Sequence, residues 1–433
     1  MTVREIVALL EGHPAATITE TSGRLRLRYA DSYPTTGATP LSVNVPTQVR
    51  EHTHAKVSAL LWGLLPDNER VLRRWARNYQ VSAASAVSLL ASPVGADCAG
   101  AVQFTAAANV EELINREGTL DWLTDAEVAD KLRGLAADGS DWLGERVKSG
   151  QFSLAGTQAK LALRRDVSTG RWATPHGSEP TTHILKPGID GIEGHALNEH
   201  LCLATARRLG LRAARSTIEV FEEQVAVVVE RFDRTRVGDQ LVRVHQEDMC
   251  QALGINPDAK YEQDGGPGVA DITALLRKLL PPDVAADATT RLVDALLFNW
   301  LIGGTDAHAK NYGLLLSGDQ VRLAPLYDVA SMLPYEHDPL KLRSAMKVGG
   351  SYRFKAIYPR NWHKLAQIVA MDPDALLARA RTLAMQLPDA LSDTHADAVS
   401  VQPDVPLPPR MIDAVGSWSQ RCLVSLERSR ASV

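Results

Sequence analysis

The chain has 433 residues, of which 45% are hydrophobic, so it is long enough to bury more than one core, and two domains are expected. Its formal net charge of −4 and the absence of a basic run argue against a broad nucleic-acid-binding surface. Four scattered cysteines without metal or disulfide spacing, no signal-peptide layout and no apolar run of about 18 residues predict a cytoplasmic protein without membrane association.

The first 105 residues predict a small α/β domain. Polar and apolar residues alternate on either side of Ser22-Gly23, which is typical of a β-hairpin. The other elements expected here are a strand at 41–45 and helices at 58–63 and 68–79. No catalytic combination of side chains occurs in this part of the sequence. Residues 106–150 are charged and helical in pattern, and we interpret them as a connector.

A loop of small residues follows at 152–160, FSLAGTQAK, and leads into a strand at 161–165. Small residues let backbone N–H groups approach a phosphate closely, and Ala155, Gly156 and Ala159 provide them. The loop has one glycine where the protein-kinase phosphate loop has three, so by itself it is a weak indication of phosphate binding.

Two charged residues of the following elements have two interpretations each. Lys186 ends an apolar strand, where a lysine either extends to solvent or pairs with a phosphate. Glu199 lies in a helix expected at 194–209, and it is either the ion-pair partner of Lys186 or a surface residue.

A strand pair is expected at 217–220 and 225–229, and it leads into the polar segment 230–234. A strand that ends in such a segment offers backbone N–H and C=O groups to an adenine ring. For Phe232, ordinary core packing is the other interpretation.

The rest of the chain is predominantly helical in pattern, because apolar residues recur every three or four positions. The helix at 285–302 is apolar on several faces and must be buried. The loop 261–268, YEQDGGPG, is too rich in glycine for regular structure, and the sequence gives it no role. The other helices expected here are 246–253, 271–280, 362–370, 373–387 and 414–429.

The buried helix ends at Gly303-Gly304, where a polar loop begins. A hairpin is predicted next, from apolar runs on either side of 317–320. Asp306 and Asn311 have the Asp-x-x-x-x-Asn spacing of protein kinases, and Asp328 follows the hairpin as the second Asp of kinases does. In phosphoryl transfer the first Asp orients and deprotonates the acceptor hydroxyl, while the Asn and the second Asp hold Mg²⁺.

Six segments in the same order resemble the HipA kinases, the toxin half of bacterial toxin–antitoxin pairs. The resemblance covers about residues 151–358 and is weaker in the N-terminal region. The segments are FSLAGTQAKLAL, THILKPGI, VVERFDR, HQEDMCQALG, GGTDAHAKNYGLLL and LAPLYDVAS.

This resemblance implies an α+β, two-lobed protein-kinase-like fold and activity as a serine/threonine protein kinase that uses ATP and Mg²⁺. The implied domains are an N-terminal α/β accessory domain (1–105), a helical connector (106–150), a kinase N-lobe (151–235) and a mainly helical C-lobe (236–433). The implied ATP-binding residues are Ala155, Gly156, Thr157, Gln158, Ala159, Lys160, Lys186, Glu230, Arg231, Phe232, His308, Lys310 and Tyr327. Asp306 is the implied base, and Asn311 and Asp328 are the implied metal ligands.

Regulation and partners are also implied by the resemblance. Autophosphorylation is expected at Ser153, with Thr157 as the second candidate, and the added charge is expected to inhibit ATP binding. The implied partners are a helix-turn-helix antitoxin like HipB, which supplies the DNA binding, and a protein substrate of the aminoacyl-tRNA synthetase class. Two alternatives stay open, a small-molecule kinase of the same fold and a catalytically inactive nucleotide-binding partner.

Overall fold

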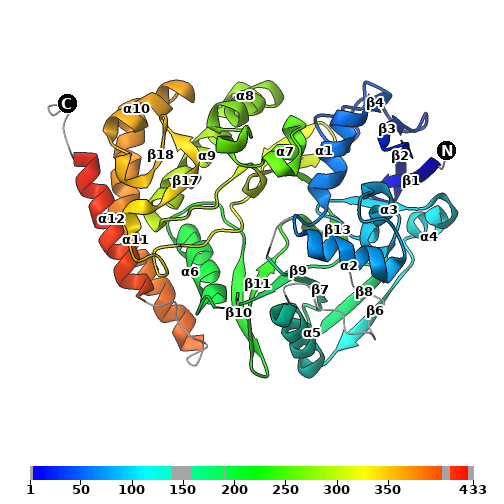
Figure 1. Ribbon diagram of the computed structural model, residues 1–433, viewed down its shortest axis with the longest axis horizontal. Helices are drawn as coiled ribbons and strands as arrows, with labels where there is room; N and C mark the ends of the chain where they lie inside the picture. The colour runs from blue at the N-terminus through cyan, green and yellow to red at the C-terminus, as the bar shows by residue number, and fades with distance from the viewer. Residues whose placement is uncertain (1–2, 139–157, 190, 402–409, 428–433) are drawn as a thin grey trace. The chain divides into compact units, whose positions relative to one another are not determined.

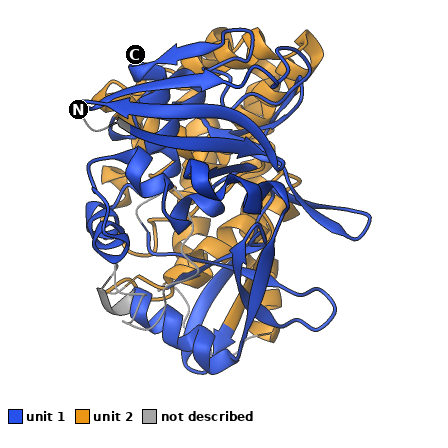
Figure 2. Ribbon diagram, turned by 90° about the vertical axis from the view of Figure 1, so that its right-hand side faces the viewer, with its two compact units in different colours: residues 1–187, 220–258, 313–324 blue, residues 188–219, 259–312, 325–433 orange. Residues whose placement is uncertain are grey.

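The computed structural model describes residues 3–138, 158–189, 191–401 and 410–427, and the chain forms two compact units (Figures 1 and 2). Unit 1 comprises residues 1–187, 220–258 and 313–324, and unit 2 comprises residues 188–219, 259–312 and 325–433. The units group the chain differently from the predicted domains, because residues 220–258 and 313–324 belong with the N-terminal part.

Unit 1 begins with a five-stranded sheet of order β4-β3-β2-β1-β5. The predicted hairpin is confirmed, since β2 and β3 pair antiparallel across Ser22 and Gly23, both of which have a positive φ. Side chains from this sheet share one core with three helices. The elements are β1 (Val3–Leu10), β2 (His13–Thr21), β3 (Arg24–Tyr29), β4 (Glu51–Thr53), β5 (Val102–Thr105), α1 (His54–Leu64), α2 (Glu69–Tyr79) and α3 (Ala86–Leu90).

The strand predicted at 41–45 is wrong, because the segment forms turns instead. Its amides bond to side chains and local carbonyls rather than to a neighbouring strand. The Leu41 N–H donates to the Tyr29 hydroxyl at 2.9 Å, and the Val43 N–H donates to Glu247 Oε1 at 2.8 Å. Residues 41–45 have the period-two alternation of a strand, but among the described residues they pair with no sheet edge.

The second sheet has six strands in the order β10-β11-β9-β7-β8-β6. Its strand β6 lies inside the predicted helical connector, which is therefore only partly helical. The strand is mostly exposed at the sheet edge, so it lacks the apolar alternation that would have revealed it. The elements are α4 (Val110–Ile114), β6 (Gly118–Leu123), α5 (Asp125–Asp138), β7 (Leu161–Arg165), β8 (Trp172–Gly177), β9 (His183–Pro187), β10 (Ser216–Phe221) and β11 (Gln224–Glu230).

The rest of unit 1 corrects one helix and confirms one hairpin. The helix predicted at 246–253 is a strand followed by a short helix, which starts at a capping box of Asp248 and Gln251. The hairpin predicted on either side of 317–320 is confirmed, because β15 and β16 pair antiparallel. The elements are β12 (Arg234–Val237), β13 (Gln240–Arg243), β14 (His245–Asp248), α7 (Met249–Leu253), β15 (Gly313–Ser317) and β16 (Gln320–Leu323).

Unit 2 is mainly helical, and its predicted helices are confirmed with shifted ends. The buried helix α9 is held from two sides by indole groups: Trp300 donates to the Phe354 carbonyl at 3.2 Å, and Trp418 donates to the Trp300 carbonyl at 2.8 Å. Within the described ranges, no helix has the length and apolar character needed to span a membrane. The elements are α6 (His195–Arg208), α8 (Val269–Leu279), α9 (Pro282–Ile302), β17 (Arg343–Val348), β18 (Ser351–Arg353), α10 (Pro359–Ile368), α11 (Pro373–Val401) and α12 (Met411–Glu427).

Candidate active site

The C-terminal end of α9 fixes the start of the predicted catalytic loop. Gly303 caps the helix with a φ of 66°, a left-handed conformation that favours glycine. A Cβ at Gly304 would lie 2.3 Å from Asn299 Oδ1, so this position has no room for a side chain. Both glycines are therefore required for the chain to leave the buried helix at this angle.

The predicted base, Asp306, lies in the loop after these glycines, and its side chain is 64% exposed. The loop closes on itself, because the Asn311 amide nitrogen donates to the Asp306 carbonyl at 2.7 Å and the His308 N–H donates to the same carbonyl at 2.8 Å. An exposed carboxylate on a braced loop can meet an acceptor hydroxyl that arrives from outside.

A tyrosine that the sequence did not single out contacts the predicted base directly. The Tyr261 hydroxyl donates to Asp306 Oδ1 at 2.6 Å, and its ring lies edge-on to the His308 imidazole with centroids 4.8 Å apart. The neighbouring Lys260 carbonyl accepts from the Ala309 N–H at 3.3 Å. Tyr261 thus holds one carboxylate oxygen of Asp306 and leaves the other, Oδ2, for an acceptor.

The glycine-rich loop 261–268 presents this tyrosine. Its chain folds back so closely that a Cβ at Gly266 would lie 2.0 Å from the Ala259 carbonyl, and the Gly266 N–H donates to the Tyr261 carbonyl at 2.9 Å. Glu262 anchors the loop to β17, since it accepts from the Lys347 N–H at 2.6 Å and lies 3.4 Å from Lys347 Nζ. The loop therefore supports Asp306, the predicted base.

The second predicted metal ligand, Asp328, is half-buried and has a φ of 57°. A left-handed backbone is uncommon outside glycine, and such strain persists only where the surroundings impose it. Here they do, because Asn198 of α6 clasps Ser331, donating to its carbonyl at 2.8 Å and accepting from its N–H at 2.9 Å. The Ser331 hydroxyl in turn donates to the Ile302 carbonyl at 2.5 Å.

The two loops are joined to each other as well. The Tyr327 hydroxyl donates to the Lys310 carbonyl at 2.7 Å, and the Met332 N–H donates to the Gly303 carbonyl at 3.2 Å. Asp306, Asn311 and Asp328 thus lie on loops that unit 2 ties to one helix end. This brings together three of the residues that the sequence predicted.

His308 is 4% exposed, and its pKa is lowered from 6.5, first by burial and further by Lys260, while Asp306 opposes the shift. The imidazole is therefore neutral at pH 7. Its Nε2 lies 3.9 Å from Asp306 Oδ1, which is too far for a hydrogen bond. The predicted contact of His308 with a γ-phosphate would thus be that of a neutral group, without the positive charge of a kinase lysine.

Lys186 lies in unit 1 on strand β9, opposite Val227 of β11, and is 5% exposed. Its burial excludes the interpretation that it extends to solvent, and its pairing with phosphate stays a prediction. Glu199, in unit 2, is 2% exposed, which excludes the surface interpretation of this residue. The side chains of both residues are therefore buried, and neither lies on the protein surface.

The predicted phosphate loop is described in part. Ser153, Ala155, Gly156 and Thr157 lie outside the described residues. Gln158 donates to the Pro187 carbonyl at 3.4 Å, which ties the end of the loop to the strand that carries Lys186. Ala159 packs against the core of the six-stranded sheet, and Lys160 is half-buried beside it.

In the predicted hinge, Arg231 has a structural role that the sequence did not indicate. Its guanidinium, 1% exposed, donates to Asp233 Oδ2 at 2.7 Å, Thr181 Oγ1 at 2.8 Å and the Cys98 carbonyl at 2.8 Å, and it pairs with Asp97 Oδ2 at 3.2 Å. Its N–H donates to the Thr182 carbonyl at 2.9 Å. With its donors engaged by protein, the assignment of Arg231 to ATP stays a prediction that these contacts do not support.

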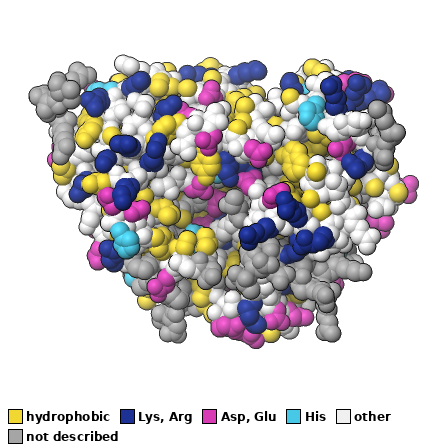
Figure 3. Space-filling model, in the orientation of Figure 1, with side chains coloured by type: hydrophobic (Ala, Val, Ile, Leu, Met, Phe, Trp, Pro, Cys, Tyr) yellow, Lys and Arg dark blue, Asp and Glu magenta, His cyan; other side chains and the backbone are white. Residues whose placement is uncertain are grey.

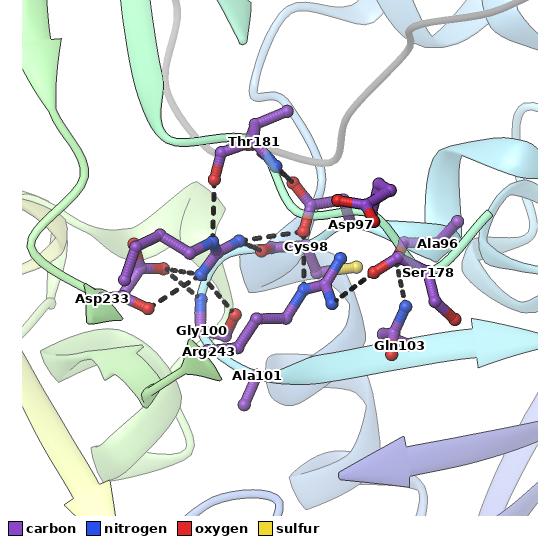
Figure 4. Close-up of polar contacts among 12 residues, drawn as sticks. Ala96, Asp97, Cys98, Gly100, Ala101, Gln103, Ser178, Thr181, Asp233 and Arg243 are labelled. Atoms are coloured by element: carbon purple, nitrogen blue, oxygen red, sulfur yellow. Dashed lines mark hydrogen bonds and ion pairs between the residues drawn. The ribbon is translucent and has the colours of Figure 1, made fainter. Parts of the chain in front are cut away.

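The acidic centre of this buried cluster is Asp97, which Figure 4 shows beside Thr181 and Arg243. Burial would raise the pKa of Asp97, but the guanidinium groups of Arg234, Arg243 and Arg231 lower it well below its ordinary value. Two buried carboxylates and three guanidinium groups thereby join the segment before β5 to β12 and β13. Removing one partner would leave an unpaired buried charge.

Among the described residues, no group of three or more His, Cys, Asp or Glu side chains could hold a metal ion. The candidate ligands are the Asn311 amide oxygen and the Asp328 carboxylate, which are the hard oxygen donors that Mg²⁺ prefers. Two protein oxygens suit an Mg²⁺ that takes its other ligands from nucleotide phosphates and water.

These features define a kinase-like fold with an N-terminal domain. A HipA, HipB and operator DNA complex of Shewanella oneidensis contains a chain with the same fold, with a TM-score of 0.79, 24% identity and coverage of 97% of this chain and 96% of that one. The HipA-like C-terminal domain family matches residues 152–391, and the HipA N-terminal domain family matches residues 6–105. The chain belongs to the HipA family.

Two relatives cover most of the chain. The Y4mE protein of Sinorhizobium fredii is 32% identical over 377 residues, which are 85% of this chain and 86% of the relative. The serine/threonine-protein kinase toxin HipA of Shewanella oneidensis is 29% identical over 369 residues, or 82% of this chain and 80% of the toxin.

The Tyr261 contact generates a prediction. Tyr261→Phe should lower kcat for phosphoryl transfer about tenfold and leave the KM for ATP nearly unchanged, because a hydrogen bond to a charged group is lost at the base alone. Tyr33→Phe is the matched control, since it removes a tyrosine hydroxyl that donates to a carbonyl at 2.7 Å in the N-terminal domain. Steady-state kinetics measure both variants, and an unchanged kcat in Tyr261→Phe would show that Asp306 does not need the tyrosine.

Proposed function

We propose that the chain is an Mg²⁺/ATP-dependent serine/threonine protein kinase that acts as a cytoplasmic toxin. The observation that carries this proposal is the arrangement of Asp306, Asn311 and Asp328 on two loops tied to the end of α9. The spacing of these residues matches the kinase pattern, and the chain belongs to the HipA family.

In the proposed reaction, the acceptor hydroxyl of a serine or threonine donates its hydrogen bond to Asp306 Oδ2, while Tyr261 occupies Oδ1. As the acceptor oxygen bonds to the γ-phosphorus of ATP, its proton passes to Asp306 and the bond between phosphorus and the leaving oxygen of ADP breaks. The exposure of Asp306 supports this role, because the acceptor belongs to another molecule or to a distant part of the chain.

Asn311 and Asp328 would hold Mg²⁺, whose chemistry is to neutralise charge on the β- and γ-phosphates. The donor end of the Asn311 amide is used by the Asp306 carbonyl, so the acceptor end, Oδ1, is the atom that would hold the cation. The backbone of Asp328 has a positive φ, and the chain three residues later is fixed by the bonds between Asn198 and Ser331. Lys186 would pair with the phosphates as a buried point charge.

The remaining assignments for ATP rest on the family resemblance. They are the small-residue loop (Ala155, Gly156, Thr157, Gln158, Ala159 and Lys160), the segment Glu230–Phe232, and His308, Lys310 and Tyr327. We also infer a helix-turn-helix antitoxin of the HipB kind as a partner, because a neighbouring structure is a complex of HipA, HipB and operator DNA. An aminoacyl-tRNA synthetase is the proposed substrate, and the resemblance alone supports it.

The two alternatives make different demands on the site. A small-molecule kinase would transfer phosphate to sugars or antibiotics and not to proteins in a cell extract. A catalytically inactive nucleotide-binding partner would not need an exposed base held by a dedicated tyrosine, and the Tyr261–Asp306 contact therefore favours the active enzyme.

The metal assignment predicts different behaviour for two variants. Asp328→Ala should abolish the tightening of ATP binding by Mg²⁺, because the cation loses an anionic ligand. Lys186→Ala should weaken ATP binding with or without Mg²⁺, since its contact is to phosphate. Isothermal titration with and without the metal measures both effects. If the two variants respond to Mg²⁺ in the same way, the separate roles are wrong.

The autophosphorylation assignment predicts that Ser153 carries phosphate after incubation with Mg²⁺ and ATP, and that ATP affinity then falls. A phosphoserine adds a charge of about −1.5 to −2 beside a loop that must approach the ATP phosphates. Mass spectrometry identifies the phosphorylated residue. Titration with ATP before and after the incubation measures the change in ATP affinity. Phosphate on Thr157 alone would move the assignment, and phosphate at Ser153 with unchanged affinity would contradict the inhibition.

A further inference from the structure

The segment 339–371 of unit 2 contains no Asp or Glu, although the whole chain has a net charge of −4. All of its lysines and arginines are exposed. We call them the basic hairpin surface, because three lie on β17 and β18. Its members are Lys341, Arg343, Lys347, Arg353, Lys355, Arg360 and Lys364. They are spaced apart in the sequence, so no contiguous basic run reveals them.

The fold brings these cations close together. Arg343 and Arg353 are directly paired across β17 and β18, and a Cβ at Gly350 in the turn would lie 3.3 Å from Lys364 Nζ. Like charges opposite each other on two strands destabilise a sheet, so the arrangement has a cost. Figure 3 shows lysine and arginine side chains gathered over the region of β17, β18 and α10.

Most of this charge has no acidic partner in the part of the chain that the structure describes. Lys347 pairs with Glu262 at 3.4 Å, and Lys341 lies 3.9 Å from Asp338. The other five cations, Arg343, Arg353, Lys355, Arg360 and Lys364, have no carboxylate within ion-pair distance there. A surface that concentrates one sign of charge attracts a partner of the opposite sign.

The surface is connected to the catalytic loop by two contacts. Lys347 pairs with Glu262, and the preceding residue, Tyr261, donates to the base Asp306 at 2.6 Å. Lys347 therefore lies near the place where the acceptor hydroxyl must lie. The basic hairpin surface is thus within reach of the residues that flank an acceptor serine or threonine.

We propose that the basic hairpin surface binds acidic residues that flank the acceptor serine or threonine of the substrate. This inference rests on the proposed kinase function and names the substrate class of that same site. A single-stranded nucleic acid fits less well, because base stacking needs open aromatic faces and cations already lie over the two tyrosine rings here. Arg343 and Lys347 lie over the Tyr352 ring at 5.7 and 5.2 Å, and Arg360 lies over the Tyr358 ring at 5.7 Å.

The test uses the full-length chain and three fluorescent peptides of equal length, in which the acceptor serine is flanked on both sides by Glu, Gln or Lys. Binding is measured by fluorescence anisotropy, and phosphoryl transfer is measured separately with labelled ATP and Mg²⁺. We expect the Glu peptide to bind about tenfold more tightly than the Gln peptide, at roughly twofold for each of several exposed ion pairs. The Lys peptide should bind most weakly.

The variant Arg343→Gln, Arg353→Gln, Lys355→Gln should reduce the preference for Glu over Gln to within about twofold. The matched control, Arg277→Gln, Lys278→Gln, Arg421→Gln, removes the same charge from exposed positions on α8 and α12 and should keep the preference. Thermal unfolding of both variants confirms that they are folded.

Equal binding of the Glu and Gln peptides by the wild type would overturn the inference, and so would a preference that survives in the hairpin variant. Tight binding of a DNA or RNA duplex that only the hairpin variant loses, without a peptide preference, would assign the surface to nucleic acid instead. Binding of the Glu peptide with no transfer to any acceptor would support the docking surface and contradict the proposed kinase function alone.

Discussion

The candidate site depends on how one buried helix ends. The helix α9 must terminate at Gly303 and Gly304, because the first has a left-handed backbone and the second has no room for a Cβ. The loop that carries Asp306 leaves from this point, and the segment that carries Asp328 returns to it through bonds from Ser331 and Met332 to the last carbonyls of the helix. A helix fixed in the core thus sets the positions of both loops, which is the preorganisation that phosphoryl transfer requires.

In this arrangement, the side chain with the proposed catalytic role is exposed, whereas the residues that support it are mostly buried. Asp306 is the exposed group, while the residues that hold it and its neighbours in place are mostly buried, including His308 and Asn198. Tyr261 and Glu262 add two contacts to this support. Tyr261 donates to Asp306, the proposed base, and Glu262 accepts from the Lys347 N–H of β17. The glycine-rich loop thereby joins the proposed base to the basic hairpin surface, so that the proposed catalysis and the proposed substrate recognition would share one structural element in unit 2.

The sequence could predict what is local and periodic. It located the helix that ends in two glycines, the loop with Asp306 and Asn311, and the hairpin that precedes Asp328. It could not predict Tyr261, because the tyrosine meets Asp306 across 45 residues and no pattern links the two. For the same reason, the sequence could not predict the ion pair between Arg231 and Asp97, because these residues are 134 positions apart. Strands β6 and β17 were missed because neither alternates regularly: β6 is mostly exposed, and β17 has three consecutive buried residues, 344–346.

Asp306 is the proposed base of a protein kinase. The most direct test compares the wild type with Asp306→Asn, each incubated with labelled ATP, Mg²⁺ and a cell extract, followed by mass spectrometry of the phosphosites and by ATP titration. The account predicts that serine or threonine sites labelled by the wild type lose label by a factor of about 10² or more in the variant, while ATP affinity stays within a few-fold. A folded variant that labels the same sites at the same rate would contradict the account.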